Sequence, residues 1–234
     1  MTNLIAWAIT GAGYLLAETF SSMQNLVHEY DVKVTTFLSL AAIETVRIYG
    51  FNETLSRISN GSYYSEVLTE REESAAAPHA GRFSKRAYDV LIVSPATANT
   101  VAKIVNGIAD TLVTNAVAHA CKSNVPLLII PTDQEEETET ILPPMVDREA
   151  CRACEVCPPI EECPHKAVER VEGKARIDLS KCCGAGICAK VCPYGVVKIG
   201  EHVEVKARRV DLENVRKLRG MDRIEVLSNP SESL

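Results

Sequence analysis

The chain has 234 residues, of which 46% are hydrophobic and 24% are charged, the proportions of a globular protein that buries an ordinary core. Its 25 Lys and Arg against 31 Asp and Glu give a net charge of −6, which disfavours binding to nucleic acid or to an anionic membrane surface. No apolar run reaches the length of about 18 residues that a membrane-spanning helix needs, and residues 1–9 lack the basic start of a signal peptide. We therefore expect a cytoplasmic protein of one or two domains, with no nucleic-acid or membrane partner.

The first 130 residues alternate short β-branched runs with amphipathic segments. This alternation predicts an α/β fold with a parallel sheet covered by helices on both faces, because strands buried on both sides are apolar throughout. The expected strands are residues 4–9, 32–37, 89–94 and 127–130. The expected helices are residues 15–29, 40–49, 97–105 and 110–122. Ligands of such sheets bind beyond the carboxyl ends of the strands, so the loops there are the candidate site.

The loops after the first two expected strands have the residues of an anion site. Thr10-Gly11-Ala12-Gly13 opens a helix whose free N–H groups can bind a phosphate. Leu16 replaces the third glycine of a dinucleotide motif, which favours a mononucleotide. Ser39 precedes the next helix, where its hydroxyl can cap the helix or bind a phosphate oxygen. A plain strand-to-helix turn and a simple cap are the alternatives at these two places.

The loop after the third expected strand reads Pro95-Ala96-Thr97-Ala98-Asn99-Thr100. Its small residues allow a planar ligand to approach the backbone, and Thr97, Asn99 and Thr100 offer polar contacts to the edge of a ring. A helix start with proline near the first turn is the alternative. The residues by themselves leave both interpretations open.

This loop, together with Gly107-Ile108-Ala109-Asp110 downstream, resembles the PASANT signature of the homo-oligomeric flavin-containing cysteine decarboxylase superfamily. Thr10-Gly11 and Ser39 with Ala42 are similar to other flavin-contacting segments of that superfamily. The resemblance implies a flavodoxin-like parallel sheet that binds FMN. It also implies a homo-oligomer built from trimers, with the flavin at a subunit boundary. The implied FMN contacts are Thr10, Gly11, Ala12, Gly13, Ser39, Pro95, Ala96, Thr97, Asn99 and Thr100.

Two departures from the superfamily bear on the chemistry. Its Pro-x-Met-Asn-x-x-Met segment after the last strand is missing, which disfavours decarboxylation; the chain instead runs into the acidic residues 135–139, expected to be a solvated linker closed by Pro143-Pro144. His79 stands sixteen residues before Pro95, close to the place of the superfamily's catalytic histidine, but the residues after it differ. His79 is therefore the candidate catalytic residue, and an ordinary loop histidine is the alternative.

Eight of the nine cysteines lie within residues 151–192, whereas Cys121 stands alone in a helical pattern and reads as a small buried residue. In a cytoplasmic chain such a group favours metal ligation over disulfides. The first motif is Cys151, Cys154 and Cys157 with Cys163-Pro164, and the second is Cys182, Cys183 and Cys188 with Cys192-Pro193. Each Cys-Pro step is followed by a Val-rich segment that can pair as a hairpin.

This order is that of bacterial two-cluster ferredoxins, in which the proline-flanked fourth cysteine of each motif binds the cluster of the other motif. It predicts two [4Fe–4S] clusters. One is held by Cys151, Cys154, Cys157 and Cys192, and the other by Cys182, Cys183, Cys188 and Cys163. Ala185 stands where a middle cysteine is usual and Cys183 replaces it, so the second cluster can be distorted or incomplete. A zinc site is the alternative.

The fusion of the two parts resembles the archaeal dihydromethanopterin reductase family. The resemblance implies that electrons pass from reduced ferredoxin, or a similar donor, through the clusters to FMN and on to a pterin substrate, giving tetrahydromethanopterin. An electron carrier without an organic substrate and a flavin-dependent decarboxylase are the alternatives. The expected parts are an FMN-binding domain (1–145), a smaller α+β ferredoxin-like domain (146–208) and a C-terminal extension (209–234) with a short helix over residues 211–219.

Overall fold

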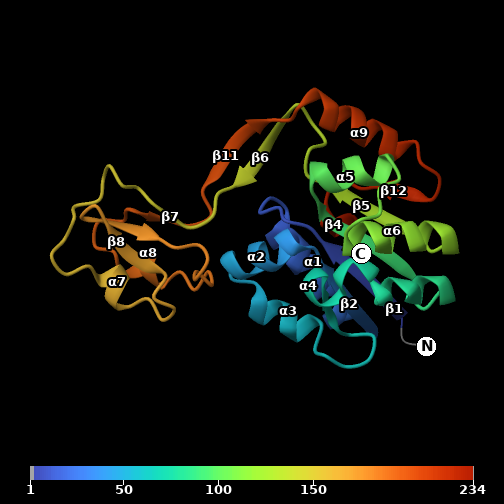
Figure 1. The fold of residues 1–234 in the computed structure, drawn as a ribbon, viewed down its shortest axis with the longest axis horizontal. Helices are drawn as coiled ribbons and strands as arrows, with labels where there is room; N and C mark the ends of the chain where they lie inside the picture. The colour runs from blue at the N-terminus through green and yellow to red at the C-terminus, as the bar shows by residue number, and fades with distance from the viewer. Residues whose placement is uncertain (1–2, 234) are drawn as a thin grey trace.

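Six parallel strands form the central sheet of the computed structural model, which describes residues 3–233 (Figure 1). Their spatial order is β12-β5-β4-β1-β2-β3, and every neighbouring pair is parallel. In chain order they are β1 (Asn3–Ile9), β2 (Val32–Leu38), β3 (Val67–Thr69), β4 (Val90–Ala96), β5 (Leu127–Pro131) and β12 (Ile224–Val226). The predicted parallel α/β sheet is confirmed. The sequence indicated four of these strands, since β3 and β12 are too short to show a pattern.

Helices cover both faces of the sheet. On one face lie α1 (Leu16–Glu29), α2 (Leu40–Ile48) and α3 (Asn52–Ile58). On the other face lie the 3-10 helix η2 (Pro78–Lys85), α5 (Ala98–Val105), α6 (Leu112–Ser123) and α9 (Arg209–Arg219). The shorter elements are α4 (Glu70–Glu73), η1 (Ser74–Ala76) and η3 (Pro230–Ser233). The predicted helices are present, with ends that differ from the expected ones by a few residues.

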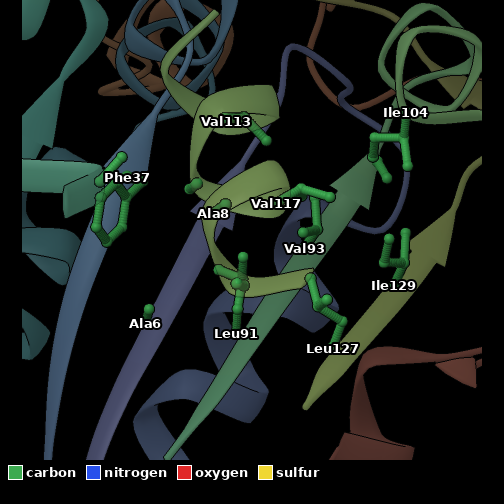
Figure 2. Close-up of a cluster of buried hydrophobic side chains, with 14 of the residues drawn as sticks. Ala6, Ala8, Phe37, Leu91, Val93, Ile104, Val113, Val117, Leu127 and Ile129 are labelled. Atoms are coloured by element: carbon green, nitrogen blue, oxygen red, sulfur yellow. The ribbon is translucent and has the colours of Figure 1, made fainter. Parts of the chain in front are cut away.

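The packing of helices on the sheet makes a rigid frame for the loops at its edge. Figure 2 shows Val113 and Val117 of α6 and Ile104 of α5 projecting toward the side chains of β1, β4 and β5. Val93 and Ile129 on these strands are completely buried. Burying an aliphatic side chain of this size stabilises the fold by roughly 1.5–3 kcal/mol. The strands therefore hold their carboxyl ends in fixed positions.

The strand order reverses between β1 and β4. From β1 the chain goes outward to β2 and β3, and then it returns to β4 and β5 on the other side. In a doubly wound sheet the crevice beyond the carboxyl ends at this reversal is the usual ligand site. The loops that meet there are those after Ile9 and Ala96, which contain the candidate flavin contacts.

A smaller cysteine-rich domain, defined here as residues 142–201, lies beside the sheet domain (Figure 1). Its elements are β7 (Met145–Val146), α7 (Pro158–Glu161), β8 (Val168–Val171), β9 (Lys174–Ile177), α8 (Ile187–Val191) and β10 (Val197–Lys198). The first Val-rich segment forms the hairpin β8–β9 as predicted. For the second segment the hairpin prediction is wrong: β10 pairs with β7, and the residues after it pair outside the domain.

An antiparallel ribbon of β6 (Glu137–Ile141) and β11 (His202–Lys206) connects the two domains. The acidic run was expected to be a solvated linker; it does connect the two domains, but as a strand, because its backbone is paired with a strand more than sixty residues away. Its charges find partners across the ribbon: Glu137 lies opposite Lys206, and His202 Nδ1 is 3.0 Å from a Glu139 oxygen. The ribbon holds both ends of the cysteine-rich domain together.

After the ribbon the chain returns to the sheet domain. Helix α9 packs against α5, its side chains Val215 and Leu218 join the core, and β12 extends the sheet beside β5. The predicted terminal helix is thus present and begins two residues earlier than expected. Among the described residues, no helix is both long enough and apolar enough to cross a membrane.

Candidate functional site

Thr10 joins the two loops at the reversal of the strand order. Its hydroxyl donates a hydrogen bond to the carbonyl oxygen of Pro95 at 2.6 Å and accepts one from the N–H of Thr97 at 2.9 Å. The N–H of Thr10 donates to the same Pro95 oxygen at 3.2 Å. Because the side chain is only 1% exposed and both of its hydrogen-bonding functions are used, Thr10 positions the site through these loops.

The glycine turn after β1 packs directly against α2. A Cβ atom on Gly11 would overlap the Cβ of Ala41, so only glycine allows this approach. Gly13 lies against the hydroxyl of Tyr49. Helix α1 follows the turn, and its N-cap, Leu15, provides no side-chain hydrogen bond. The first N–H groups of α1 thus lack a side-chain cap, although that of Leu16 donates to the Gly13 carbonyl at 3.3 Å, and the helix begins just after β1 at the carboxyl edge of the sheet, where an anion can bind.

Ser39 and Thr97 are both helix N-caps. Ser39 Oγ accepts a hydrogen bond from the N–H of Ala42 at 3.1 Å, and Thr97 Oγ1 accepts one from the N–H of Thr100 at 3.5 Å. The capping role that the sequence allowed for Ser39 is therefore present, and Thr97 caps α5 in the same way. Capping uses an oxygen lone pair, and a hydroxyl has a proton to donate as well, so a cap can also bind a phosphate or a ring oxygen.

The loop over residues 95–100 is buried on one side and open on the other. Pro95, Ala96 and Thr100 are buried, Thr97 is half-buried, and Asn99 is exposed. Because it is exposed, Asn99 offers an amide, with both donor and acceptor atoms, to a ligand beside the loop. The peptide bond between Ser94 and Pro95 is cis. The assignment of this loop to a flavin stays a prediction.

A cavity opens at the same edge of the sheet. It lies between the start of α1, the end of β5 and the ribbon, and its volume is about 860 Å³ including the part open to solvent. Tyr14, Thr132, Glu139 and Glu204 are among its lining residues. Burial and the charge of Glu139 raise the pKa of Tyr14, so its hydroxyl stays protonated around neutral pH. The cavity thus combines an aromatic side chain with several hydrogen-bond acceptors.

His79 lies in η2, and its partner is the carboxylate of Glu73. Nδ1 of His79 is 2.5 Å from Oε1 of Glu73, whose Oε2 accepts a hydrogen bond from the His79 N–H at 3.0 Å. Glu73 is 6% exposed and the His79 side chain is 40% exposed. The pair orients the imidazole through Nδ1. His79 does not line the cavity beside the glycine turn, and its catalytic role stays a prediction.

One cavity in the cysteine-rich domain gathers cysteines from both motifs. Its lining includes Cys163, Cys182, Cys183 and Cys188, and its volume is about 320 Å³ including the space open to solvent. Burial, followed by the proximity of Cys182 and Cys163, raises the pKa of the Cys188 thiol. The backbone N–H of Ala167 donates to Cys163 Sγ at 3.3 Å. The structure thus brings together the four residues that the sequence assigned to the second cluster.

A second cavity gathers the other four cysteines, Cys151, Cys154, Cys157 and Cys192, in a volume of about 390 Å³. Burial raises the pKa of the Cys157 thiol, and the neighbouring Cys154 and Cys151 add to this effect. All eight cysteines are free of disulfides. The eight cysteines thus line two separate cavities, four in each, which is more thiols than one tetrahedral zinc ion requires.

The remaining cysteine is separate from both groups. Cys121 lies on α6, is half-buried, and packs against the apolar core. It lines neither of the two cavities that gather the other cysteines.

Two residues that the sequence did not single out connect the domains. Arg47 and Tyr49, at the end of α2, donate hydrogen bonds to backbone carbonyls of Cys182 and Ile141. Nothing in the pattern of a helix arginine or tyrosine distinguishes such a contact from a solvated side chain. The only signal was the Glu44–Arg47 spacing of three residues, which indicates a local ion pair.

The fold and the site together define a flavoprotein. The chain belongs to the Flavoprotein family, whose model matches residues 2–141. It is also similar along nearly its whole length to archaeal proteins named dihydromethanopterin reductase (acceptor). The one from Methanosarcina mazei is 44% identical over 232 residues, 98% of this chain and 97% of the relative. The one from Methanocaldococcus jannaschii is 47% identical over 98% of this chain and 94% of the relative.

A solved structure shares the fold. It is that of Burkholderia xenovorans DmrB in complex with FMN, described as a cubic protein cage for redox transfer. The two structures superpose with a TM-score of 0.61 at 24% sequence identity, covering 98% of this chain and 89% of DmrB. The flavoprotein resemblance and the fold class expected from the sequence are confirmed.

Proposed function

We propose that this chain is a dihydromethanopterin reductase. It would take electrons one at a time from reduced ferredoxin, or a similar donor, through two [4Fe–4S] clusters and FMN. Two electrons and two protons then add across one carbon–nitrogen double bond of dihydromethanopterin to give tetrahydromethanopterin. The observation that carries this proposal is the near full-length similarity to reductases of that name, which spans the flavoprotein sheet and both cysteine motifs.

FMN fits the carboxyl edge of the sheet at the reversal of the strand order. The uncapped start of α1 and the hydroxyl of Ser39 would bind its phosphate, and the loop with Asn99 would contact the ring. The close packing of Gly11 on α2 keeps these two anchors side by side. When bound, the flavin supplies the conversion between one-electron donors and a two-electron hydride transfer. The similar DmrB is described in complex with FMN.

The two cysteine groups fit two [4Fe–4S] clusters. Each cavity is lined by three cysteines of one motif and the proline-flanked cysteine of the other, an arrangement that ties the two halves of the domain together. Cys183 lines the cavity with Cys182, so it can act as the fourth ligand despite its displaced position in the motif. Thiolates are the ligands that such clusters need.

The pterin is assigned to the cavity beside the glycine turn. A pterin ring has an amino group and a ring N–H on one edge, and carboxylates such as Glu139 and Glu204 are matching acceptors. Tyr14 offers an aromatic face next to them. These two glutamates lie directly opposite each other in the ribbon, where like charges repel; His202 contacts Glu139, and a hydrogen-bond donor beside Glu204 would relieve the repulsion further.

The donor would dock on the cysteine-rich domain. This domain has nine Lys and Arg against nine Asp and Glu, so the net charge of −6 lies on the rest of the chain. Arg152 and Arg170 line the cavity of the Cys151 group and offer positive charge to an acidic donor. We also propose a homo-oligomer built from trimers, located in the cytoplasm; DmrB is described as a cubic cage.

The test is an anaerobic reaction with the full chain loaded with iron and FMN. The flavin is reduced, mixed with dihydromethanopterin, and followed by its absorbance. Stoichiometric reoxidation that depends on the pterin supports the reductase. Electron exchange with ferredoxin but none with the pterin would instead favour an electron carrier.

A second arm of the experiment checks the flavin site. Asn99→Leu should lower the FMN content of the purified protein, because the amide that faces the ligand is lost. Asn106→Leu, at the far end of the same helix, is the matched control and should retain FMN, since in the described part of the chain the Asn106 amide bonds only to the Ala102 carbonyl of its own helix. Equal FMN in both variants would contradict the role given to the loop.

A further inference from the structure

Helix α2 has the candidate flavin site at one end and the cysteine-rich domain at the other (Figure 1). Its first residues follow Ser39, and Ala41 contacts Gly11 of the glycine turn. Nine residues at 1.5 Å per residue give a helix about 14 Å long. Its C-terminal residues therefore lie within that distance of the flavin anchors, on a rigid element packed into the core by Val46.

Arg47 at this end reaches across to the cysteine-rich domain. Its guanidinium donates hydrogen bonds to the carbonyl oxygens of Leu179, at 2.9 Å, and of Cys182. A third contact joins the guanidinium to the carboxylate of Glu44 at 2.5 Å, which fixes the position of the guanidinium. The side chain is 22% exposed, so these bonds are largely shielded from water. Hydrogen bonds from a charged donor are stronger than those from a neutral donor. Two such bonds from Arg47 hold the loop with Leu179 and the proposed cluster ligand Cys182.

The backbones of the two domains also touch beside Arg47. A Cβ on Gly184 would lie 2.6 Å from the Cα of Gly50 and 2.7 Å from the carbonyl oxygen of Ile48. Gly184 also has a φ of +69°, so glycine is required there both by the lack of space and by the backbone conformation. Tyr49, from the same turn of chain, bonds to the Ile141 carbonyl at the end of the ribbon. The contact is therefore a fitted surface with several independent attachments.

Only one of the two cysteine groups takes part in this contact. Cys182 bonds to Arg47 through its carbonyl, and Gly184 follows it by two residues. Leu179, Cys182 and Gly184, which contact Arg47 and Gly50, all belong to the second motif or directly precede it. Among the described hydrogen bonds and glycine contacts, α2 and the turn after it meet this motif and no cysteine of the Cys151 group. The contact therefore joins the Cys182 group to the flavoprotein domain.

We propose that Arg47 is a positioning residue that docks the group of Cys163, Cys182, Cys183 and Cys188 on α2 and raises the reduction potential of the cluster bound there. The proposal rests on the proposed function. This cluster is then the one that delivers electrons to the flavin: it loses one electron, the flavin gains it, and the donor restores it through the other cluster.

The expected sign of the potential shift follows from charge. Reduction adds a negative charge to a cluster, and a nearby guanidinium stabilises the reduced form. Glu44 acts in the opposite direction, because Arg47 lowers the pKa of its carboxyl and keeps it ionised. Removing Arg47 should make the potential more negative, and removing the charge of Glu44 should make it less negative.

The experiment compares six full-length proteins prepared without oxygen: wild type, Arg47→Ala, Arg47→Gln, Glu44→Gln, Arg57→Ala and Cys183→Ser. Arg57 is the matched control, since it is an exposed helix arginine whose one ion pair within residues 3–233 is with Glu53, one turn away. Iron, sulfide and FMN are measured first. A wild type without iron or flavin refutes the proposed function itself, which separates that failure from a failure of the Arg47 inference.

The main readouts are a redox titration followed by electron paramagnetic resonance, and the rate of flavin reduction after mixing with a reduced two-cluster ferredoxin. Both Arg47 variants should shift one cluster signal to more negative potential, Glu44→Gln should shift the same signal the other way, and Arg57→Ala should shift neither. The signal that moves should be the one lost in Cys183→Ser. Flavin reduction should slow about tenfold or more in Arg47→Ala, because loosening the contact lowers the effective concentration of cluster at the flavin.

Three results would overturn the inference: equal shifts of both signals, no shift in either Arg47 variant, or an unchanged rate of flavin reduction in Arg47→Ala. If Arg47→Ala loses its iron, Arg47→Gln and Glu44→Gln decide the matter. Glu44→Gln keeps the arginine contacts, so a potential that fails to rise in it contradicts the charge argument.

Discussion

The carbonyl oxygen of Pro95 accepts hydrogen bonds from both the hydroxyl and the N–H of Thr10, at 2.6 and 3.2 Å. Thr10 follows the last residue of β1 and Pro95 is the penultimate residue of β4, so their contact joins the ends of two adjacent parallel strands at the reversal of the strand order. The N–H of Thr97 completes the arrangement by donating to the same hydroxyl. One buried side chain thus fixes the relative positions of the glycine turn and the loop over residues 95–100.

Replacing Thr10 by valine tests this arrangement with almost no change in volume. The variant loses two hydrogen bonds and leaves buried polar groups without that partner, which should lower the free energy of unfolding by about 1–3 kcal/mol. FMN content should fall with it. Thr45→Val in α2 is the control, because the Thr45 hydroxyl bonds only within its own helix and its loss should cost less than about 0.5 kcal/mol. Urea unfolding and flavin fluorescence give the two measurements, and equal stability of both variants would contradict the role of Thr10.

The loops at the sheet edge were predictable because their chemistry is local. A glycine turn after an apolar run and a polar loop after another run each identify a strand end, and parallel strands bring such ends to one edge. Thr10 was expected among the flavin contacts, but the sequence does not show that its hydroxyl is used by the neighbouring loop. The hydrogen bond from Thr10 to Pro95 joins residues 85 positions apart, and motif spacing does not predict contacts between segments so distant in the sequence.

The cysteine assignments lead to a prediction about metal content. Anaerobically prepared protein should contain about eight iron atoms per chain, as two four-iron clusters require. Cys183→Ser should lose about half of the iron and sulfide, because the group around Cys182 would keep only three thiolates. Cys121→Ser should keep all of it, since Cys121 lies on α6 in the other domain. Protein loaded with zinc and free of iron, or full iron in Cys183→Ser, would refute the cluster assignment.

A half-buried ion pair in the sheet domain should make the free energy of unfolding depend on pH. Arg82 donates to both oxygens of Glu66 at 3.0 and 3.1 Å. Burial raises the pKa of the Glu66 carboxyl, but the bonds from Arg82 outweigh this and lower it. A carboxyl with a lowered folded-state pKa contributes stability above its unfolded pKa of about 4.3 and loses it as the pH falls through the folded value.

Glu66→Gln should therefore lower the free energy of unfolding at pH 7 by roughly 2 kcal/mol and flatten its decline between about pH 5 and pH 3. The control Glu53→Gln breaks an exposed pair within α3 and should change the free energy by less than about 0.5 kcal/mol. Urea unfolding across this pH range gives the result. A decline as steep in Glu66→Gln as in wild type would show that other groups cause it.

The ribbon and the return of the chain to the sheet were beyond sequence reasoning for physical reasons. Residues 137–141 are rich in charge and read as a linker, because both strands of the ribbon are largely exposed and show no apolar face. Strand β12 has only three residues, and its place beside β5 is set by the packing of α9 on α5. The two cavities, by contrast, gather the cysteines in the sets that the motif order predicts, since the spacing of such ligands follows from the cluster and not from the surrounding fold. Their role as cluster ligands stays a prediction.

The ribbon allows the cysteine-rich domain to be removed cleanly. Ile141 pairs with His202, and the N–H of Leu142 donates to the Glu201 carbonyl at 2.8 Å, so the two ends of the domain already lie side by side. Replacing residues 143–200 by Asn-Gly should close β6 and β11 into a hairpin with a two-residue turn. The shortened chain keeps α9 and β12. A chain that simply stops at Pro144 loses both, which uncovers the edge of β5 and the core around Leu218, and it should fold poorly.

We expect the hairpin-closed chain to bind FMN, to contain no iron, and to lose reduction by ferredoxin. Its flavin, once reduced chemically, should still reduce dihydromethanopterin, because the glycine turn, Ser39 and the loop over residues 95–100 are unchanged. Size-exclusion chromatography must first show the same number of subunits as the full chain, since the flavin site is proposed to lie at a subunit boundary. If a shortened assembly of that size accepts electrons from ferredoxin as fast as the full chain, the clusters are not the route by which electrons reach the flavin. Loss of pterin reduction with FMN still bound would instead place part of the substrate site on the cysteine-rich domain.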